Sequence, residues 1–84
     1  MEMVAFGTFY AAKVVDACEK KIAMFQKDLK RTDFSPRYLE DTKKCIYDYE
    51  KLKDFATTQL YVGTITLDMN TFNMIKEYYV KDRP

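Results

Sequence analysis

The sequence contains no histidine, and this absence removes most of the familiar catalytic arrangements. Ser-His-Asp and Cys-His sites are excluded, and the commonest general base near neutral pH is missing. Cys18 and Cys45 do not have C-x-x-C spacing, so a Cys/His metal site is not available either. The two glycines, Gly7 and Gly63, are too few for a phosphate-cradling loop or a dinucleotide fingerprint. We therefore expect no enzymatic activity, no metal and no cofactor, with a Lys- or Tyr-based mechanism as the remaining enzymatic alternative.

The chain also lacks a charge excess and a long apolar run. The sequence has 14 Lys and Arg residues against 13 Asp and Glu residues, so no bulk field attracts nucleic acid or anionic lipid. No segment approaches the roughly 18 to 20 apolar residues of a membrane span, and the first residues show no positive region of a signal peptide. We therefore expect a cytoplasmic protein. Because an apolar fraction of 48% is too high for a disordered chain, we expect one globular domain over residues 1–84.

Ser35 and Pro36 mark the start of a helix near the middle of the chain. The Ser35 side chain can cap free backbone donors, and Pro36 suits the first helical position because its missing donor would be unpaired there. On both sides, residues spaced by three and four form heptad seams, which predict an antiparallel hairpin of two helices over residues 8–31 and 35–61. The seam residues are Thr8, Ala11, Val15, Cys18, Ile22, Phe25 and Leu29, and then Tyr38, Thr42, Cys45, Tyr49, Leu52, Ala56 and Gln59.

The centre of the turn predicts which seam residues face each other. In an antiparallel hairpin with its turn near position 33.5, the numbers of facing residues add to 67, which pairs Cys18 with Tyr49 and Phe25 with Thr42. Cys18 and Cys45 are then offset by about one helical turn along the seam, roughly 6 Å. This offset is poor geometry for a disulfide, so we expect both cysteines to be reduced.

The C-terminal part of the sequence predicts a third, shorter helix. Gly63 is suited to end a helix, and the following residues 64–67 are rich in β-branched side chains and suit an extended connector. Asp68 suits an N-cap position, and the apolar spacing after it predicts a helix over residues 68–81 that covers the hairpin.

These segments together predict an all-α fold, a long antiparallel helical hairpin plus a short C-terminal helix. A chain of this length hides only about 60 to 65% of its unfolded surface. Apolar side chains also flank the seam on both helices, beyond what one short helix can cover. We therefore expect homo-oligomerisation to complete a helical bundle.

Two groups of residues are candidate binding sites. The tip of the hairpin carries four cations, two anions and two aromatic rings, and cations beside rings can hold a phosphate and stack a base. The alternative is that these cations complement the helix ends while the rings close the core. The candidate ligand-binding residues are Lys27, Lys30, Arg31, Phe34, Arg37 and Tyr38.

The second group consists of aromatic residues that exceed the needs of one small core. The sequence has seven Tyr and six Phe, and tyrosine offers rigid, amphipathic contact area that is enriched at interfaces. These residues fit a surface that binds another protein or the interface of a homo-oligomer. The candidate interface residues are Phe6, Phe9, Tyr10, Tyr47, Phe55, Tyr61 and Tyr78.

Three functional hypotheses follow. The first is a small non-enzymatic protein that binds another protein. The use of Lys, Tyr, Asp and Phe resembles that of small accessory proteins of phages, some of which inhibit host defence factors, so an inhibitor is one form of this hypothesis. The second is an oligomeric binder that sequesters a nucleotide messenger. The third is a nucleic-acid-binding regulator, which the near-zero net charge disfavours.

Overall fold

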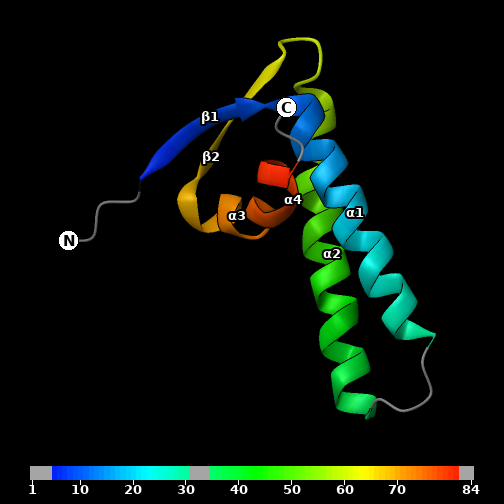
Figure 1. Ribbon diagram of the computed structural model, residues 1–84. Helices are drawn as coiled ribbons and strands as arrows, with labels where there is room; N and C mark the ends of the chain where they lie inside the picture. Colours follow the sequence, from blue (N-terminus) through cyan, green and yellow to red (C-terminus); the bar gives the residue numbers. More distant parts are fainter. Residues whose placement is uncertain (1–4, 31–34, 82–84) are drawn as a thin grey trace.

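In the chain, one strand precedes a helical hairpin and a second strand follows it, and two short helices come after the second strand (Figure 1). The computed structural model describes residues 5–30 and 35–81, without the side chains of the last two. In chain order the elements are β1 (Phe6–Tyr10), α1 (Ala11–Leu29), α2 (Pro36–Thr58), β2 (Thr64–Asp68), α3 (Met69–Asn73) and α4 (Lys76–Lys81).

The prediction of an all-α fold is wrong, because β1 and β2 form a two-stranded antiparallel sheet. Phe6 lies opposite Asp68 at one end, and Tyr10 lies opposite Thr64 at the other. The helical bundle completed by further copies is not shown. The segment assigned to the start of the first helix, from residue 8 to 10, is instead part of β1. Aromatic and threonine side chains favour a strand there, but β1 becomes a sheet only with a partner more than 50 residues away.

The sheet also starts the first helix. The Ala11 N–H donates to the Gly63 carbonyl at 3.1 Å, which continues the β1–β2 ladder by one pair and satisfies a donor that has no partner within the helix. No side chain caps α1, so this backbone bond takes the place of a cap. Gly63 has φ of +94°, a conformation that side chains disfavour, and this allows the chain to turn from α2 into β2.

The helical hairpin is confirmed, with shorter helices than predicted. Ser35 is the N-cap of α2, where its Oγ accepts a hydrogen bond from the Tyr38 N–H at 3.3 Å, and Pro36 is the first helical residue. The expected turn over residues 32–35 lies mostly outside the described residues. Across the hairpin, the rings of Phe25 and Tyr49 are 5.6 Å apart between centroids.

The facing residues differ from the predicted pairing. Phe25 was assigned to Thr42, seven residues before its ring partner Tyr49. The Lys53 Nζ lies 3.6 Å from a Glu19 carboxylate oxygen, a pair whose numbers add to 72 rather than 67. α2 therefore meets α1 with residues closer to its C-terminal end. The sheet and the short helices pack on the same faces, so the seam between two helices alone does not determine the register.

The expected third helix is divided into α3 and α4. The Tyr49 hydroxyl donates to the Met74 carbonyl at 2.7 Å, and the N–H groups of Tyr78 and Tyr79 both donate to the Ile75 carbonyl. Met74 therefore gives its carbonyl to a side chain of α2 instead of to the next turn of a continuous helix. The helix breaks where α2 supplies this hydroxyl.

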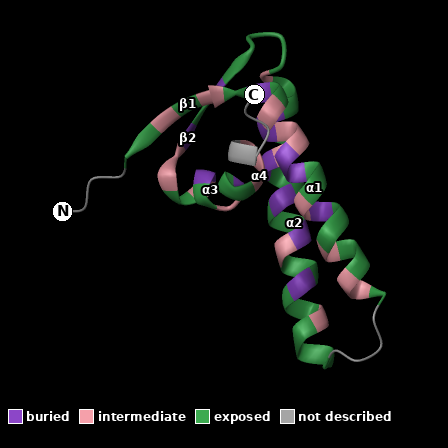
Figure 2. Ribbon diagram, in the orientation of Figure 1, coloured by how far each residue is buried: buried purple, intermediate pink, exposed green. Residues whose placement is uncertain are grey.

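The core lies between the sheet, the hairpin and the two short helices (Figure 2). Val14, Cys18 and Ile75 are fully buried at its centre. On the inner face of the sheet, the Phe9 ring stacks on Phe72 with centroids 4.1 Å apart. The short helices thus cover one half of the hairpin, and the half near the tip extends beyond them (Figure 1).

Candidate protein-binding groove

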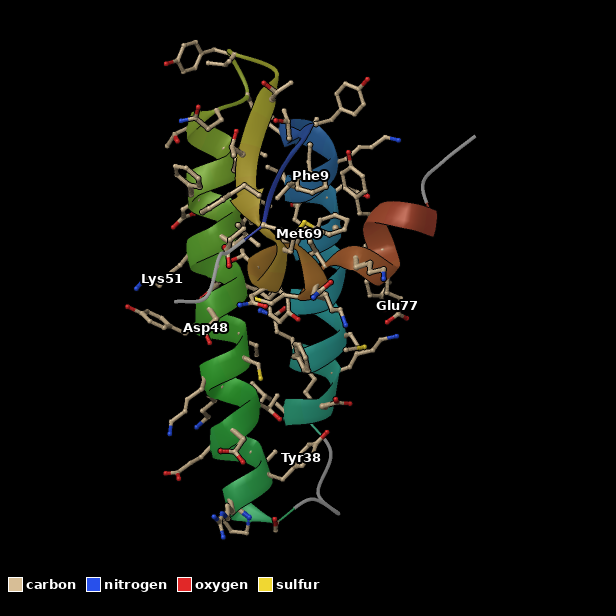
Figure 3. The ribbon with its side chains drawn as sticks, turned by 90° about the vertical axis from the view of Figure 1, so that its left-hand side faces the viewer. Phe9, Tyr38, Asp48, Lys51, Met69 and Glu77 are labelled. Atoms are coloured by element: carbon tan, nitrogen blue, oxygen red, sulfur yellow. The ribbon has the colours of Figure 1, made fainter. Side chains whose placement is uncertain are left out.

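An open groove of about 480 Å³ lies between α2 and the sheet. Figure 3 looks onto this side of the molecule, where β2 lies between α2 and β1, and it labels Asp48 and Lys51 on α2. Residues from β1, α2, β2 and the segment after β2 line the groove. They are Phe6, Asp48, Lys51, Leu52, Phe55, Thr66, Leu67, Asp68, Thr71 and Met74.

The groove runs along an edge of β2. Thr66, Leu67 and Asp68 all line it, although consecutive side chains of a strand point to opposite faces of the sheet. Leu67 is buried on the inner face, and Thr66 is exposed on the outer face. A space that touches both faces of one strand lies at its edge. Because β1 occupies the other edge of β2, the groove is at the edge that faces α2.

The hydrogen-bond pattern shows which backbone groups point to this edge. The pairs Ala11–Gly63 and Ala5–Met69 are joined by ladder hydrogen bonds, and both continue the register of the sheet. Hydrogen-bonded and non-hydrogen-bonded pairs alternate in an antiparallel ladder. The pair between Thr8 and Thr66 is therefore a non-hydrogen-bonded one. The backbone N–H and C=O of Thr64 and Thr66, and the N–H of Asp68, point away from β1 and toward the groove side. The Asp68 carbonyl is at the N-cap position of α3, where it accepts the first hydrogen bond of that helix.

Two exposed phenylalanine rings flank an apolar floor. Phe6 of β1 is 66% exposed and Phe55 of α2 is 50% exposed, and both line the groove. Leu52 and Leu67 are buried beneath them. The rings are therefore partly exposed to water beside an apolar surface. A partner that covers them contributes a binding free energy of about 25 cal/mol per Å² of apolar area that it buries.

The rim of the groove is charged. Asp48 and Lys51 are exposed on α2, and the Lys51 Nζ lies 5.0 Å from the centroid of the Tyr47 ring. At the other side, the Asp68 carboxylate accepts a hydrogen bond from the Thr71 hydroxyl. The lining residues thus carry two carboxylates and one ammonium group, an excess of one negative charge.

Two groups with shifted pKa values lie in the core and do not line the groove. Burial raises the pKa of the Cys18 thiol from 9.0 to about 12, although nearby Lys53 opposes the shift. Burial also raises the pKa of the Tyr49 hydroxyl. Both groups are therefore protonated and unreactive near neutral pH. Within residues 5–30 and 35–81, no three Cys, Asp or Glu side chains gather as metal ligands.

The structure describes four of the six predicted ligand-binding residues. Lys27 lines a cavity of about 380 Å³ beside α4, together with Lys20, Met24 and Tyr78. Lys30, Arg37 and Tyr38 lie at the helix ends near the tip and do not line that cavity. Arg31 and Phe34 lie outside the described residues, so the tip site stays a prediction.

The predicted interface residues fall into two groups. Phe6 and Phe55 line the groove, and Tyr10, Tyr47 and Tyr61 are exposed elsewhere. Phe9 and Tyr78, in contrast, are half-buried and pack against the core. Sequence reasoning missed the groove residues of β2, because the extended character of residues 64–67 was recognised without a partner strand.

Comparison with known protein families, curated proteins and solved structures finds no match to this chain. In the part of the chain that the structure describes, no helix combines the length and apolar character of a membrane span.

Proposed function

We propose that this protein acts by binding another protein, with the groove between α2 and β2 as its docking surface. The observation that carries the proposal is the exposure of two phenylalanine rings, Phe6 and Phe55, at one groove. An aromatic ring in water gains free energy when a partner covers it, and aromatic residues are enriched at the centres of protein interfaces.

The composition of the groove supports binding rather than catalysis. Its polar side chains are two aspartates, one lysine and two threonines, which are adequate to orient a partner. The buried thiol and phenol with raised pKa values are in the core and do not line this surface. A protein that covers the working surface of a host factor inhibits it without chemistry, so inhibition is the form of action that this proposal favours.

The test compares three versions of the purified protein as baits in a lysate of the cells that produce it. Phe55→Asp places a carboxylate in the groove. Lys43→Asp places a carboxylate at an exposed position of α2 that does not line the groove, and it changes the net charge by more than Phe55→Asp does. We expect that the wild type and Lys43→Asp both capture one partner protein from the lysate and that Phe55→Asp does not capture it. Calorimetry with the purified partner then gives an affinity at least about tenfold weaker for Phe55→Asp.

Two results would contradict the proposal. If Phe55→Asp is folded by circular dichroism and binds the purified partner as tightly as the wild type, the groove is not the docking surface. If every captured protein binds all three baits equally, the capture is nonspecific and the proposal fails.

A further inference from the structure

We propose that the occupant of the groove is an extended segment of the partner protein, which pairs with the outer edge of β2 as a third strand of the sheet. This inference rests on the proposed function and adds the form and chemistry of the partner. Strand addition gives affinity through main-chain hydrogen bonds and specificity through pockets for alternate side chains. A strand edge beside a groove with an apolar floor offers both.

The backbone of β2 supplies the hydrogen bonds. The ladder alternation directs the N–H and C=O of Thr66 and the N–H of Asp68 away from β1. These two residues line the groove, so a chain lying in it reaches their backbone groups. β2 has five residues, which matches an added segment of roughly four to six residues.

The outer edge of β1 is less suited to a partner. The Tyr10 N–H points to that edge and donates to the Tyr79 hydroxyl of α4 at 3.2 Å, so one of its backbone donors is already used. The cavity beside Thr8 and Tyr10 measures about 230 Å³, half of the groove volume, and none of its lining residues comes from a helix. Residues of α2 therefore line the groove beside β2 and do not line the cavity beside β1.

The groove also predicts the side chains of the added segment. Its alternate residues lie on the same face of the sheet as Leu67, above Leu52 and Met74, and this position favours an aliphatic side chain. The residues between them lie on the face of Thr66 and Phe6. The carboxylates of Asp48 and Asp68 outnumber the Lys51 ammonium group, so the electrostatics favour a segment with a flanking Lys or Arg.

The probe for the test is a synthetic peptide. A random library of eight-residue peptides is selected against the folded wild-type protein, and the tightest peptide is synthesised and titrated by calorimetry. We expect a dissociation constant below about 100 µM and a sequence with alternating aliphatic residues and a cation. A library without any such binder overturns the inference.

Two proline variants separate strand addition from other ways to fill the groove. Thr66→Pro removes the N–H that points into the groove, and Thr8→Pro removes the N–H of the directly opposite residue, which points to the other edge. Both keep the hydrogen bonds between β1 and β2, because proline is tolerated where the N–H faces outward on an edge strand. We expect peptide binding to weaken about tenfold or more in Thr66→Pro and to stay unchanged in Thr8→Pro.

A second measurement uses the wild-type protein and does not depend on how the variants fold. Amide hydrogen exchange by NMR with and without the peptide reports each backbone N–H separately. The Thr66 N–H gains protection in the complex because it donates to the added strand, and the Thr8 N–H does not change. Asp48→Asn weakens a cationic peptide by about two- to fivefold and leaves its uncharged version unaffected.

The alternative outcomes are distinct. If Phe55→Asp abolishes peptide binding while Thr66 gains no protection and both proline variants bind normally, the groove binds a partner without strand addition. The inference then fails and the proposed function stands. If Phe55→Asp binds the peptide normally, the groove itself is wrong and both fail. If the wild type is a dimer that Phe55→Asp dissociates and no peptide binds, a second copy is the occupant and the inference is overturned.

Discussion

Cys18 shows how a single residue links core packing to pH. Its side chain is fully buried, and burial raises the pKa of the thiol to about 12. The thiolate carries a charge that the apolar core does not solvate, so the folded protein keeps the proton that the unfolded chain releases above pH 9. Cys18 therefore acts as a small apolar residue, and both cysteines are free as the sequence predicts.

The stability of the protein is expected to fall as the pH rises from about 9 to 12. In this range the folded state binds the Cys18 proton and the unfolded state does not, so the slope of unfolding free energy against pH is negative. Full titration costs on the order of a few kcal/mol. Urea unfolding at several pH values, with a reducing agent present, measures this loss.

Two cysteine variants identify the source of that loss. Cys18→Ala should show a clearly smaller decline between pH 9 and 12, with a remainder from Tyr49, whose hydroxyl pKa is also raised by burial. Cys45→Ala should decline as the wild type does. An equal decline in all three proteins would show that the Cys18 thiol is not responsible.

At the scale of elements, a contact from another helix decides where a helix ends. The apolar spacing after Asp68 correctly predicts helical residues, and Asp68 is the residue before α3 as expected. The break between α3 and α4 has no local cause such as proline. It coincides with the hydrogen bond from the Tyr49 hydroxyl to the Met74 carbonyl, and this tyrosine lies 25 residues earlier in the chain.

Tyr49→Phe is expected to destabilise the protein by about 1 to 2 kcal/mol, because it leaves the Met74 carbonyl without this donor while the ring and its contact with Phe25 remain. Tyr47→Phe is the matched control, since Tyr47 is exposed on the same helix, and it should change stability by less than about 0.5 kcal/mol. Urea unfolding measures both. Equal stability of the two variants would mean that the Met74 carbonyl does not depend on Tyr49.

At the scale of the whole molecule, three consecutive apolar residues stand exposed at the end of the protein opposite the hairpin tip. Leu60, Tyr61 and Val62 are 44%, 87% and 55% exposed in the turn between α2 and β2 (Figure 1). We call them the end patch. Consecutive exposed apolar residues are uncommon in a protein that stays alone, and we propose the end patch as the contact surface of the homo-oligomer predicted from the sequence.

We expect light scattering after gel filtration to give a mass of at least twice the 10.0 kDa of one chain at about 100 µM protein. Tyr61→Asp should reduce this mass to that of one chain, because it places a charge at the centre of the end patch. Tyr47→Asp alters an exposed tyrosine away from that patch and should leave the mass unchanged. A wild-type mass of one chain would show that the oligomer prediction is wrong.

Local sequence signals determined the elements that depend on neighbouring residues. Ser35 and Pro36 specify the start of α2 because a cap and a fixed φ act within one turn. The spacing of apolar residues specified the two hairpin helices, since a helix buries one face whatever its partner is. Gly63 was correctly placed where α2 gives way to an extended segment, although its left-handed conformation follows the end of the helix by several residues.

The tertiary structure alone decided the sheet, the register of the hairpin and the groove. Each depends on residues far apart in sequence, such as Thr8 with Thr66 and Phe25 with Tyr49. The free energy of these pairings comes from burial and hydrogen bonds between segments, which a pattern within one segment does not contain. By itself the sequence determined a helical hairpin, and it excluded histidine chemistry because the chain contains no histidine. The pairing of β1 with β2 formed the strand edge and placed Phe6 at the same groove as Phe55 of α2, and we propose this groove as the binding surface.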